Sequence, residues 1–280
     1  RDPITGLYSN FDYYSFSTDK NGKTEIRRND YIYSGEKYEK IEGVSPLNET
    51  HFGHYGITLT NYYSKSKTDY SEASVILGNY PYNQSFTTHG GIFGYSSNNL
   101  YSDVDYTFTL PSLLKSSGAV DTSFYMHSYL SNFYGRDSLM PQFGFENTLF
   151  LDQMSSSIER GDSLSHIAKD SEIIDFYLNQ SNDYNFLPTD QKFFSFYTTV
   201  TTHGEYSYNP LLDDEYEFLE AVNYLGKTVD GVNNAGLSDN WAEMVKNYYA
   251  SVLDTEHAVT LIVKYLMEQD LFNDTLLVLF

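Results

Sequence analysis

The chain has 280 residues, of which 40% are hydrophobic and 17% aromatic, so it is long and apolar enough to fold around a substantial core. Its formal charge of −21 excludes a basic footprint for nucleic acid and disfavours passive adhesion to an anionic membrane surface. It contains no cysteine, which excludes disulfides and thiolate zinc sites. An anionic substrate remains compatible with this charge where a cationic pocket or a metal ion binds it.

The chain divides into two regions by composition. Residues 1–54 are polar and rich in tyrosine, and their pattern leaves their fold uncertain. Within them, Asn21-Gly22 stands between two short runs, which is the turn signal of a β-hairpin. Residues 55–63 alternate between apolar and polar side chains and predict a strand. We therefore expect a Tyr-rich N-terminal segment over 1–54 and a separate folded region over 55–280.

Helical and strand patterns alternate through that second region. Thr68 is a typical N-cap for a helix over 69–78, and Gly78 is typical of its end. Further helices are predicted over 107–119, 171–180 and 238–272. Strands are predicted over 120–127, around 148–151, over 192–203 with His203 at the end, and over 274–280. An acidic stretch over 211–222 is interpreted as a solvated helix face.

This order of elements predicts an α/β fold, with a mostly parallel sheet sandwiched by helices. Ligands of such sheets bind outside the carboxyl ends of the strands. Three polar clusters follow predicted strands there: SKSKTD with Thr68, MHSYLSNFYGRD with His127, Tyr134 and Arg136, and TTHGEY with His203. A helix start favours an ionised hydroxyl and arginine contacts tetrahedral oxyanions through two donors, so the clusters predict a phosphate or sulfate ester site.

The same residues also have purely structural interpretations. Thr68 can cap a helix without any chemical part, and His127 and His203 can be ordinary histidines at strand ends. Arg136 can form a structural ion pair with the neighbouring Asp137. From the local pattern alone, both interpretations stay open.

Several segments resemble the lipoteichoic-acid synthase family of the alkaline phosphatase/sulfatase superfamily. FYMHSYLSNFYGRD resembles a family segment with a histidine, an aromatic residue (usually Trp) seven positions on, and Asn-Arg-Asp. NYYSKSKTDYSEASVILGNYP is similar to a Lys-Thr segment whose threonine is the metal-bound nucleophile, and FYTTVTTHGEY to a strand ending in a substrate-contacting histidine. The helix and strand before Phe280 resemble those that lead to the family's Asp-His metal ligands. Tyr134 and Gly135 depart from the pattern, standing where Trp and Asn are usual.

The resemblance spans residues 55–280 and implies a partial catalytic domain, sulfatase-like and cut before the Asp-His pair. It implies Thr68 as the nucleophile and as a ligand of Mn²⁺ (or Mg²⁺). It also implies that the substrate is bound by four side chains: His127, Tyr134, Arg136 and His203. The metal-binding glutamate that usually ends the family's first strand has no counterpart in residues 1–54.

The implied reaction is transfer of glycerol phosphate from phosphatidylglycerol to a growing lipoteichoic-acid-type polymer, through a threonine-bound intermediate. The implied place is the extracellular face of the cell membrane in a Gram-positive bacterium, with an anchor of membrane helices ahead of Arg1. One alternative is another phosphoglycerol or phosphoethanolamine transferase, or a sulfatase-like hydrolase. Another is a catalytically degenerate extracellular domain that binds the cell wall.

Overall fold

The structure is a computed structural model that describes residues 68–78, 106–161, 167–180, 184–221 and 239–280, with four short strands before residue 41. The predicted strand over 55–63 lies outside these residues. The chain forms two compact units. The first, called here the sheet unit, comprises residues 59–156 and 182–198. The second, the helical unit, comprises residues 1–58, 157–181 and 199–280.

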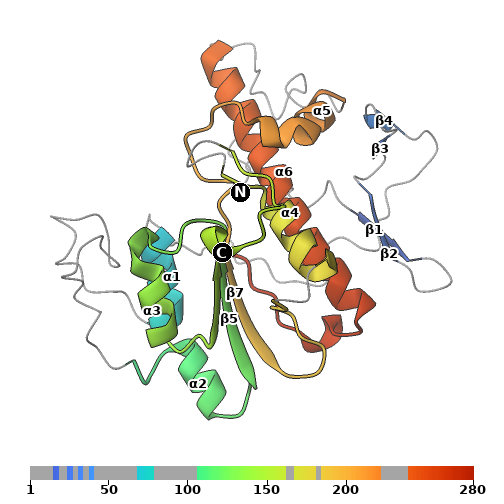
Figure 1. Ribbon diagram of the computed structural model, residues 1–280. Coiled ribbons are helices and arrows are strands. Elements are labelled where there is room, and N and C mark those ends of the chain that lie inside the picture. The colour runs from blue at the N-terminus through green and yellow to red at the C-terminus, as the bar shows by residue number, and fades with distance from the viewer. Residues whose placement is uncertain are drawn as a thin grey trace. The chain divides into compact units, whose positions relative to one another are not determined.

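A parallel sheet of three strands forms the centre of the sheet unit (Figure 1). Its strands are β5 (Thr122–His127), β6 (Asn147–Phe150) and β7 (Phe193–Thr198), in the order β6-β5-β7. All six residues of β5 are buried, the polar Thr122, Ser123 and His127 included, as expected for the central strand of a parallel sheet. The register pairs His127 with both Phe150 and Thr198, so the three strands end at one edge. The parallel sheet and its helices confirm the predicted α/β class.

Three helices belong to the sheet unit and gather beside β5 and β7 in Figure 1. They are α1 (Thr68–Leu77), α2 (Leu110–Ser116) and α3 (Arg136–Gln142). Helix α2 lies within the predicted range of 107–119: Thr109 caps it by accepting from the Ser112 backbone N–H, and Pro111 lies in its first turn. Helix α1 ends before Gly78, whose φ of 66° is the left-handed conformation that glycine favours. The sequence predicts Thr68 as the N-cap of this helix, but Thr68 is its first helical residue, so the helix begins one residue earlier than predicted.

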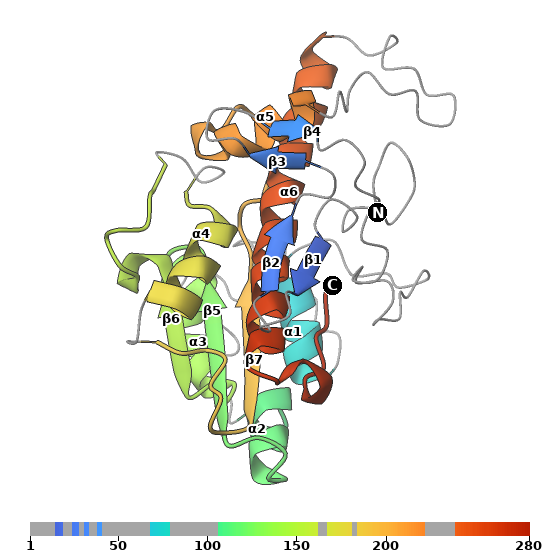
Figure 2. The ribbon, with the colours of Figure 1, turned by 90° about the vertical axis from the view of Figure 1, so that its right-hand side faces the viewer.

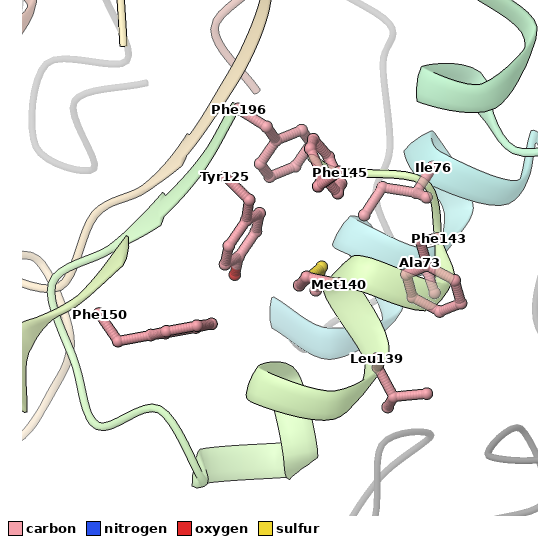
Figure 3. Packing of buried hydrophobic residues seen from close by; sticks show 9 residues of the cluster. All are labelled: Ala73, Ile76, Tyr125, Leu139, Met140, Phe143, Phe145, Phe150 and Phe196. Carbon is pink, nitrogen blue, oxygen red and sulfur yellow. The ribbon is translucent and has the colours of Figure 1, made fainter. Parts of the chain in front are cut away.

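The core of the sheet unit lies between these helices and one face of the sheet (Figure 3). Tyr125 of β5 and Phe196 of β7 are register partners, and their rings stack with centroids 5.8 Å apart. Ala73 and Ile76 from α1 and Met140 from α3 belong to the same buried cluster. Helices α1 and α3 therefore pack on the face of the sheet that carries Tyr125 and Phe196.

The helical unit contains α4 (Asp170–Asp175), α5 (Asp213–Ala221) and α6 (Asp239–Glu268). Its strands are β1 (Ser15–Thr18), β2 (Thr24–Arg27), β3 (Tyr31–Tyr33) and β4 (Tyr38–Lys40). Strands β1 and β2, which flank the predicted turn in the sequence, pair antiparallel, and this confirms the predicted hairpin pairing. Strand β2 lies along α6 and β4 lies beside α5 (Figure 2). Among the described residues, no helix has the length and apolar character needed to cross a membrane.

Two predicted strand boundaries are wrong. Strand β7 ends at Thr198 rather than at His203, because the N–H groups of Val200 and Thr201 donate to the Asp170 carboxylate instead of to a sheet ladder. Residues 274–280 are predicted as a closing strand, but they pair with no strand in the described part of the chain, and the apolar side chains of 276–280 are exposed. An apolar run becomes a strand only where a neighbour satisfies its backbone groups.

The interpretation of residues 211–222 as a solvated face is wrong for one side chain. Asp213, Asp214 and Glu217 of α5 are exposed, but Glu215 is fully buried. Its carboxylate accepts from Lys169 Nζ at 3.1 Å. Burial alone would lower the pKa of Lys169, but the Glu215 charge outweighs it and the net shift is upward. The pair satisfies a carboxylate that would otherwise be costly to bury.

We expect Gly144→Ala to destabilise the sheet unit more than Gly118→Ala. Both glycines have positive φ, 96° and 73°, so alanine is strained at either, by about 1–2 kcal/mol. At Gly144 the new Cβ also lies 3.2 Å from the Ser112 backbone nitrogen and too close to its hydroxyl, whereas nothing lies within 4 Å at Gly118. Urea unfolding of the two variants measures the difference, and equal losses would contradict the close approach at Gly144.

Candidate functional site

Two residues meet where strands β5 and β7 end. His127, the last residue of β5, donates from Nδ1 to the backbone oxygen of Thr198, the last residue of β7, at 3.0 Å. A carbonyl oxygen only accepts hydrogen bonds, so the Nδ1 atom carries a proton and Nε2 is the acceptor of a neutral ring. The side chain of His127 is only 4% exposed. The strand ends therefore fix both the position and the tautomer of this imidazole.

The loop after β5 carries Tyr134 and is tied to the end of β6. Ser131 donates to Asp152 from its backbone nitrogen at 2.9 Å and from its hydroxyl at 2.7 Å. Tyr134 and Gly135 then adopt φ values of 60° and 68°, two consecutive left-handed residues ahead of α3. This turn sets the Tyr134 ring at 5.1 Å from the guanidinium carbon of Arg136. The ring of Tyr134 is half-buried.

Arg136 is buried inside the sheet unit, and each of its three guanidinium nitrogens has a partner there. It donates to Glu72 from Nε at 3.0 Å and from Nη2 at 2.9 Å, a two-pronged ion pair in which the side chains are 1% and 2% exposed. Its Nη1 donates to the backbone oxygen of Phe133 at 3.3 Å. The structural interpretation of Arg136 thus applies, but with Glu72 as its partner rather than Asp137. In this arrangement the guanidinium orders its surroundings instead of facing solvent.

Glu72 is the site residue that the sequence interpretation missed. Besides Arg136, its carboxylate accepts from the Tyr125 hydroxyl at 3.0 Å and from the Thr198 hydroxyl at 2.6 Å. The sequence offers one signal for it: Glu72 follows Thr68 by four positions, so both side chains lie on one face of α1. That signal does not distinguish a buried glutamate from a solvated one.

The charges of this cluster shift two pKa values. Burial, and then the nearby Glu72 carboxylate, raise the pKa of Tyr125 well above its usual value. Burial alone would lower the pKa of Arg136, but Glu72 outweighs it and the net shift is upward. Tyr125 therefore stays a neutral donor and Arg136 a cation throughout the physiological pH range.

Thr68, the predicted nucleophile, is exposed at the first position of α1. One helical turn separates it from Glu72, a rise of about 6 Å along the axis. Because Glu72 reaches Thr198 at the end of β7, the beginning of α1 lies toward the carboxyl edge of the sheet. The structure thus brings the region of Thr68, His127, Tyr134 and Arg136 together in one unit.

His203 belongs to the helical unit and is exposed. Its backbone nitrogen donates to Val200 O at 2.8 Å, which closes a turn just after β7. Hydrogen bonds to Asp254 stabilise this turn. The Thr201 hydroxyl donates to the Asp254 carboxylate at 2.7 Å, and the Asp170 backbone nitrogen donates to the same carboxylate at 2.9 Å. Asp254 of α6 is fully buried and also accepts from the Ser171 hydroxyl. A buried carboxylate therefore positions the segment that carries His203.

A metal centre does not emerge from these residues. Across the described ranges, no three side chains of His, Asp or Glu lie close enough together to hold an ion. Thr68 is the one predicted ligand that the structure places, and a single hydroxyl does not make a divalent metal site. The metal implied by the sequence resemblance therefore stays a prediction, with Thr68 as its predicted ligand among the described residues.

A parallel sheet with a helix start, an imidazole and a buried ion pair at its carboxyl edge defines an α/β domain suited to a ligand at that edge. The chain matches the family described as Sulfatase over residues 26–280. It belongs to the sulfatase family, and the sulfatase-like character predicted from the sequence is confirmed. No curated protein matches the chain.

One solved structure similar to the chain is that of the lipoteichoic acid synthase LtaP from Listeria monocytogenes. The TM-score is 0.43 and the sequence identity 18%, a level at which the likeness carries no argument about fold or function. The match covers 75% of this chain and 42% of the synthase, so this chain spans less than half of that protein's length.

We expect Asp254→Ala to lower the free energy of unfolding by about 3 kcal/mol, because Asp170 N–H and the hydroxyls of Ser171 and Thr201 lose a buried acceptor. Glu217→Ala removes an exposed carboxylate from α5 and is the matched control, with a change within about 0.5 kcal/mol. Urea unfolding measures both. Similar small losses for the two variants would mean that Asp254 does not hold the turn before His203.

Proposed function

We propose that this protein is a transferase that moves glycerol phosphate from phosphatidylglycerol to a growing lipoteichoic-acid-type polymer. The observation that carries the proposal is the placement of Thr68 at the start of a helix whose next turn is fixed, through Glu72, to the strand ends that hold His127. Membership of the sulfatase family supports chemistry on an ester of a tetrahedral oxyanion. The resemblance of four ordered segments to lipoteichoic-acid synthases favours a glycerol-phosphate substrate.

The reaction has two displacements at phosphorus. In the first, the Thr68 oxygen forms a bond to phosphorus while the bond from phosphorus to the diacylglycerol oxygen breaks. The hydroxyl proton of Thr68 is lost, and the departing diacylglycerol oxygen gains one. In the second, a hydroxyl of the polymer attacks the same phosphorus and the bond to Thr68 breaks, which restores the threonine. Phosphate ester bonds are exchanged without net hydrolysis or oxidation.

Each of the other predicted residues has a part in this proposal. His127, which donates from Nδ1 to Thr198, has Nε2 as the atom that accepts a proton and, once protonated, donates to a phosphate oxygen. Tyr134 lines the proposed pocket for the glycerol phosphate. The guanidinium of Arg136 packs against the face of the Tyr134 ring and orients it. His203, exposed on its turn, contacts the glycerol phosphate or moves a proton between the two displacements.

The proposed reaction also involves a divalent cation, Mn²⁺ or Mg²⁺, as implied by the sequence resemblance. Thr68 is the residue of this chain proposed to bind it. Such an ion would neutralise phosphate charge and ease ionisation of the hydroxyl. The roles proposed for His127, Tyr134 and His203 do not involve the cation.

The lipid substrate places the proposed activity at a membrane surface. We propose the extracellular face of the cell membrane of a Gram-positive bacterium, with contact to lipid made through segments other than the described helices. The charge of −21 makes direct adhesion to anionic lipid unfavourable, so the headgroup is recognised in the pocket and not by a basic surface. The same charge argues against nucleic acid as a partner.

Thr68→Ala is expected to reduce release of diacylglycerol from labelled phosphatidylglycerol by at least about 10³-fold, because the covalent step loses its nucleophile. The assay uses the full natural protein with Mn²⁺ and follows a single turnover. Thr107→Ala, at another exposed threonine of the sheet unit, is the control and keeps wild-type activity.

Three results would overturn the proposal in different ways. Full activity of Thr68→Ala would exclude Thr68 as the nucleophile. Release of free glycerol phosphate without polymer would indicate a hydrolase. Binding of glycerol phosphate with no release of diacylglycerol by the wild type would indicate a binding domain instead of an enzyme.

A further inference from the structure

Glu72 joins the element that carries the proposed nucleophile to those that carry the proposed substrate residues. It lies in α1, and its carboxylate contacts α3, β5 and β7 through Arg136, Tyr125 and Thr198. We propose that Glu72 is a positioning residue for phosphoryl transfer. It fixes the position of Thr68, at the start of α1, relative to His127 and Tyr134. This inference rests on the function proposed above and adds a residue that the sequence resemblance does not assign.

The first connection runs from Thr68 to His127. The Thr198 hydroxyl donates to Glu72 at 2.6 Å, and the backbone oxygen of the same residue accepts from His127 Nδ1 at 3.0 Å. The Ser128 backbone nitrogen also donates to this oxygen, at 3.4 Å. One residue at the end of β7 therefore contacts both the helix that begins at Thr68 and the imidazole. A shift of Glu72 moves the helix relative to the imidazole.

The second connection runs from Thr68 to Tyr134. Glu72 accepts two hydrogen bonds from Arg136, and the guanidinium of Arg136 lies beneath the ring of Tyr134. Tyr134 has a left-handed backbone, which a non-glycine residue adopts only where its surroundings fix it. The Arg136 side chain is part of those surroundings. Glu72 thus fixes the aromatic wall of the proposed pocket as well as the helix.

The contacts of Glu72 require its own shape and charge. One carboxylate oxygen accepts from the two hydroxyls and the other from the two guanidinium nitrogens, so each oxygen has two donors. Glutamine at this position keeps the length but directs an NH₂ group toward one pair of donors. Glu72→Gln is therefore expected to displace α1 or Arg136 while the apolar core around Ala73 and Ile76 stays packed.

The kinetic test measures single-turnover release of diacylglycerol by the full natural protein. Glu72→Gln is expected to lower the rate of the chemical step by 10- to 100-fold per folded molecule, with less than a threefold change in KM, since misplacement affects the step and not the binding. Thr198→Val, which removes one donor and keeps the backbone oxygen for His127, is expected to lower the rate by threefold to tenfold. Glu146→Gln, in the exposed pair with Lys115, is the control and leaves the rate unchanged.

A second readout does not depend on the reaction. The chain has no cysteine, so Thr68→Cys introduces a unique thiol at the start of α1. We expect Glu72→Gln to change the labelling rate of this thiol by a thiol-specific reagent at least fivefold under conditions where the protein stays folded. Glu146→Gln in the same background leaves the labelling rate unchanged. Thr198→Val replaces Glu72→Gln if the latter does not fold.

The two readouts separate the failure of this inference from the failure of the proposed function. An altered labelling rate with no diacylglycerol release by the wild type would refute the transferase and support the positioning of Thr68 by Glu72. An unchanged labelling rate, or loss of activity only in proportion to loss of folded protein, would overturn the positioning proposal. A rise in KM with an unchanged chemical step would likewise exclude it, since Glu72 would then act on binding alone.

Discussion

The sheet unit depends on the way in which the Glu72 carboxylate is buried. Taking a carboxylate and a guanidinium out of water costs several kcal/mol for each ion, and only close geometry with full hydrogen bonding offsets that cost. Here the guanidinium of Arg136 supplies two donors, and the hydroxyls of Tyr125 and Thr198 supply the others. Because these donors come from three elements, the carboxylate is satisfied only when α1, α3 and the sheet are all in place.

Much of the fold is predictable because its signals are local. The strand pattern that ends at His127, the helical pattern of α6 and the turn signal in the sequence between β1 and β2 each depend on a few neighbouring residues. Sheet membership is not local. The segment before His203 and the segment after Asp274 are both apolar or β-branched, but neither pairs along its full length, since pairing requires a neighbour that the segment itself does not specify.

The candidate site likewise combines features that local sequence predicts with features that depend on distant residues. The rule that ligands bind at strand ends predicts Thr68 and His127 as candidates from sequence, and both lie toward the carboxyl edge of the sheet. The burial of Glu72 and Glu215 is not predicted, because a glutamate in a helix is usually solvated and the neighbouring sequence gives no sign of burial. Their partners are distant in sequence: Arg136 is 64 positions from Glu72, and Lys169 is 46 positions from Glu215. Burial of a charge is a property of the tertiary contact.

The turn before α3 explains one departure from the family pattern in physical terms. Gly135 stands where the resembling family has asparagine, and its φ is 68°. Glycine and asparagine are the residues that tolerate this left-handed conformation best, so the exchange preserves the backbone although the side chain differs. Tyr134, left-handed as well, keeps an aromatic ring where tryptophan is usual. Two consecutive left-handed residues turn the chain so that the ring of Tyr134 and the guanidinium of Arg136 lie 5.1 Å apart, and this geometry connects Tyr134 to Glu72 through Arg136.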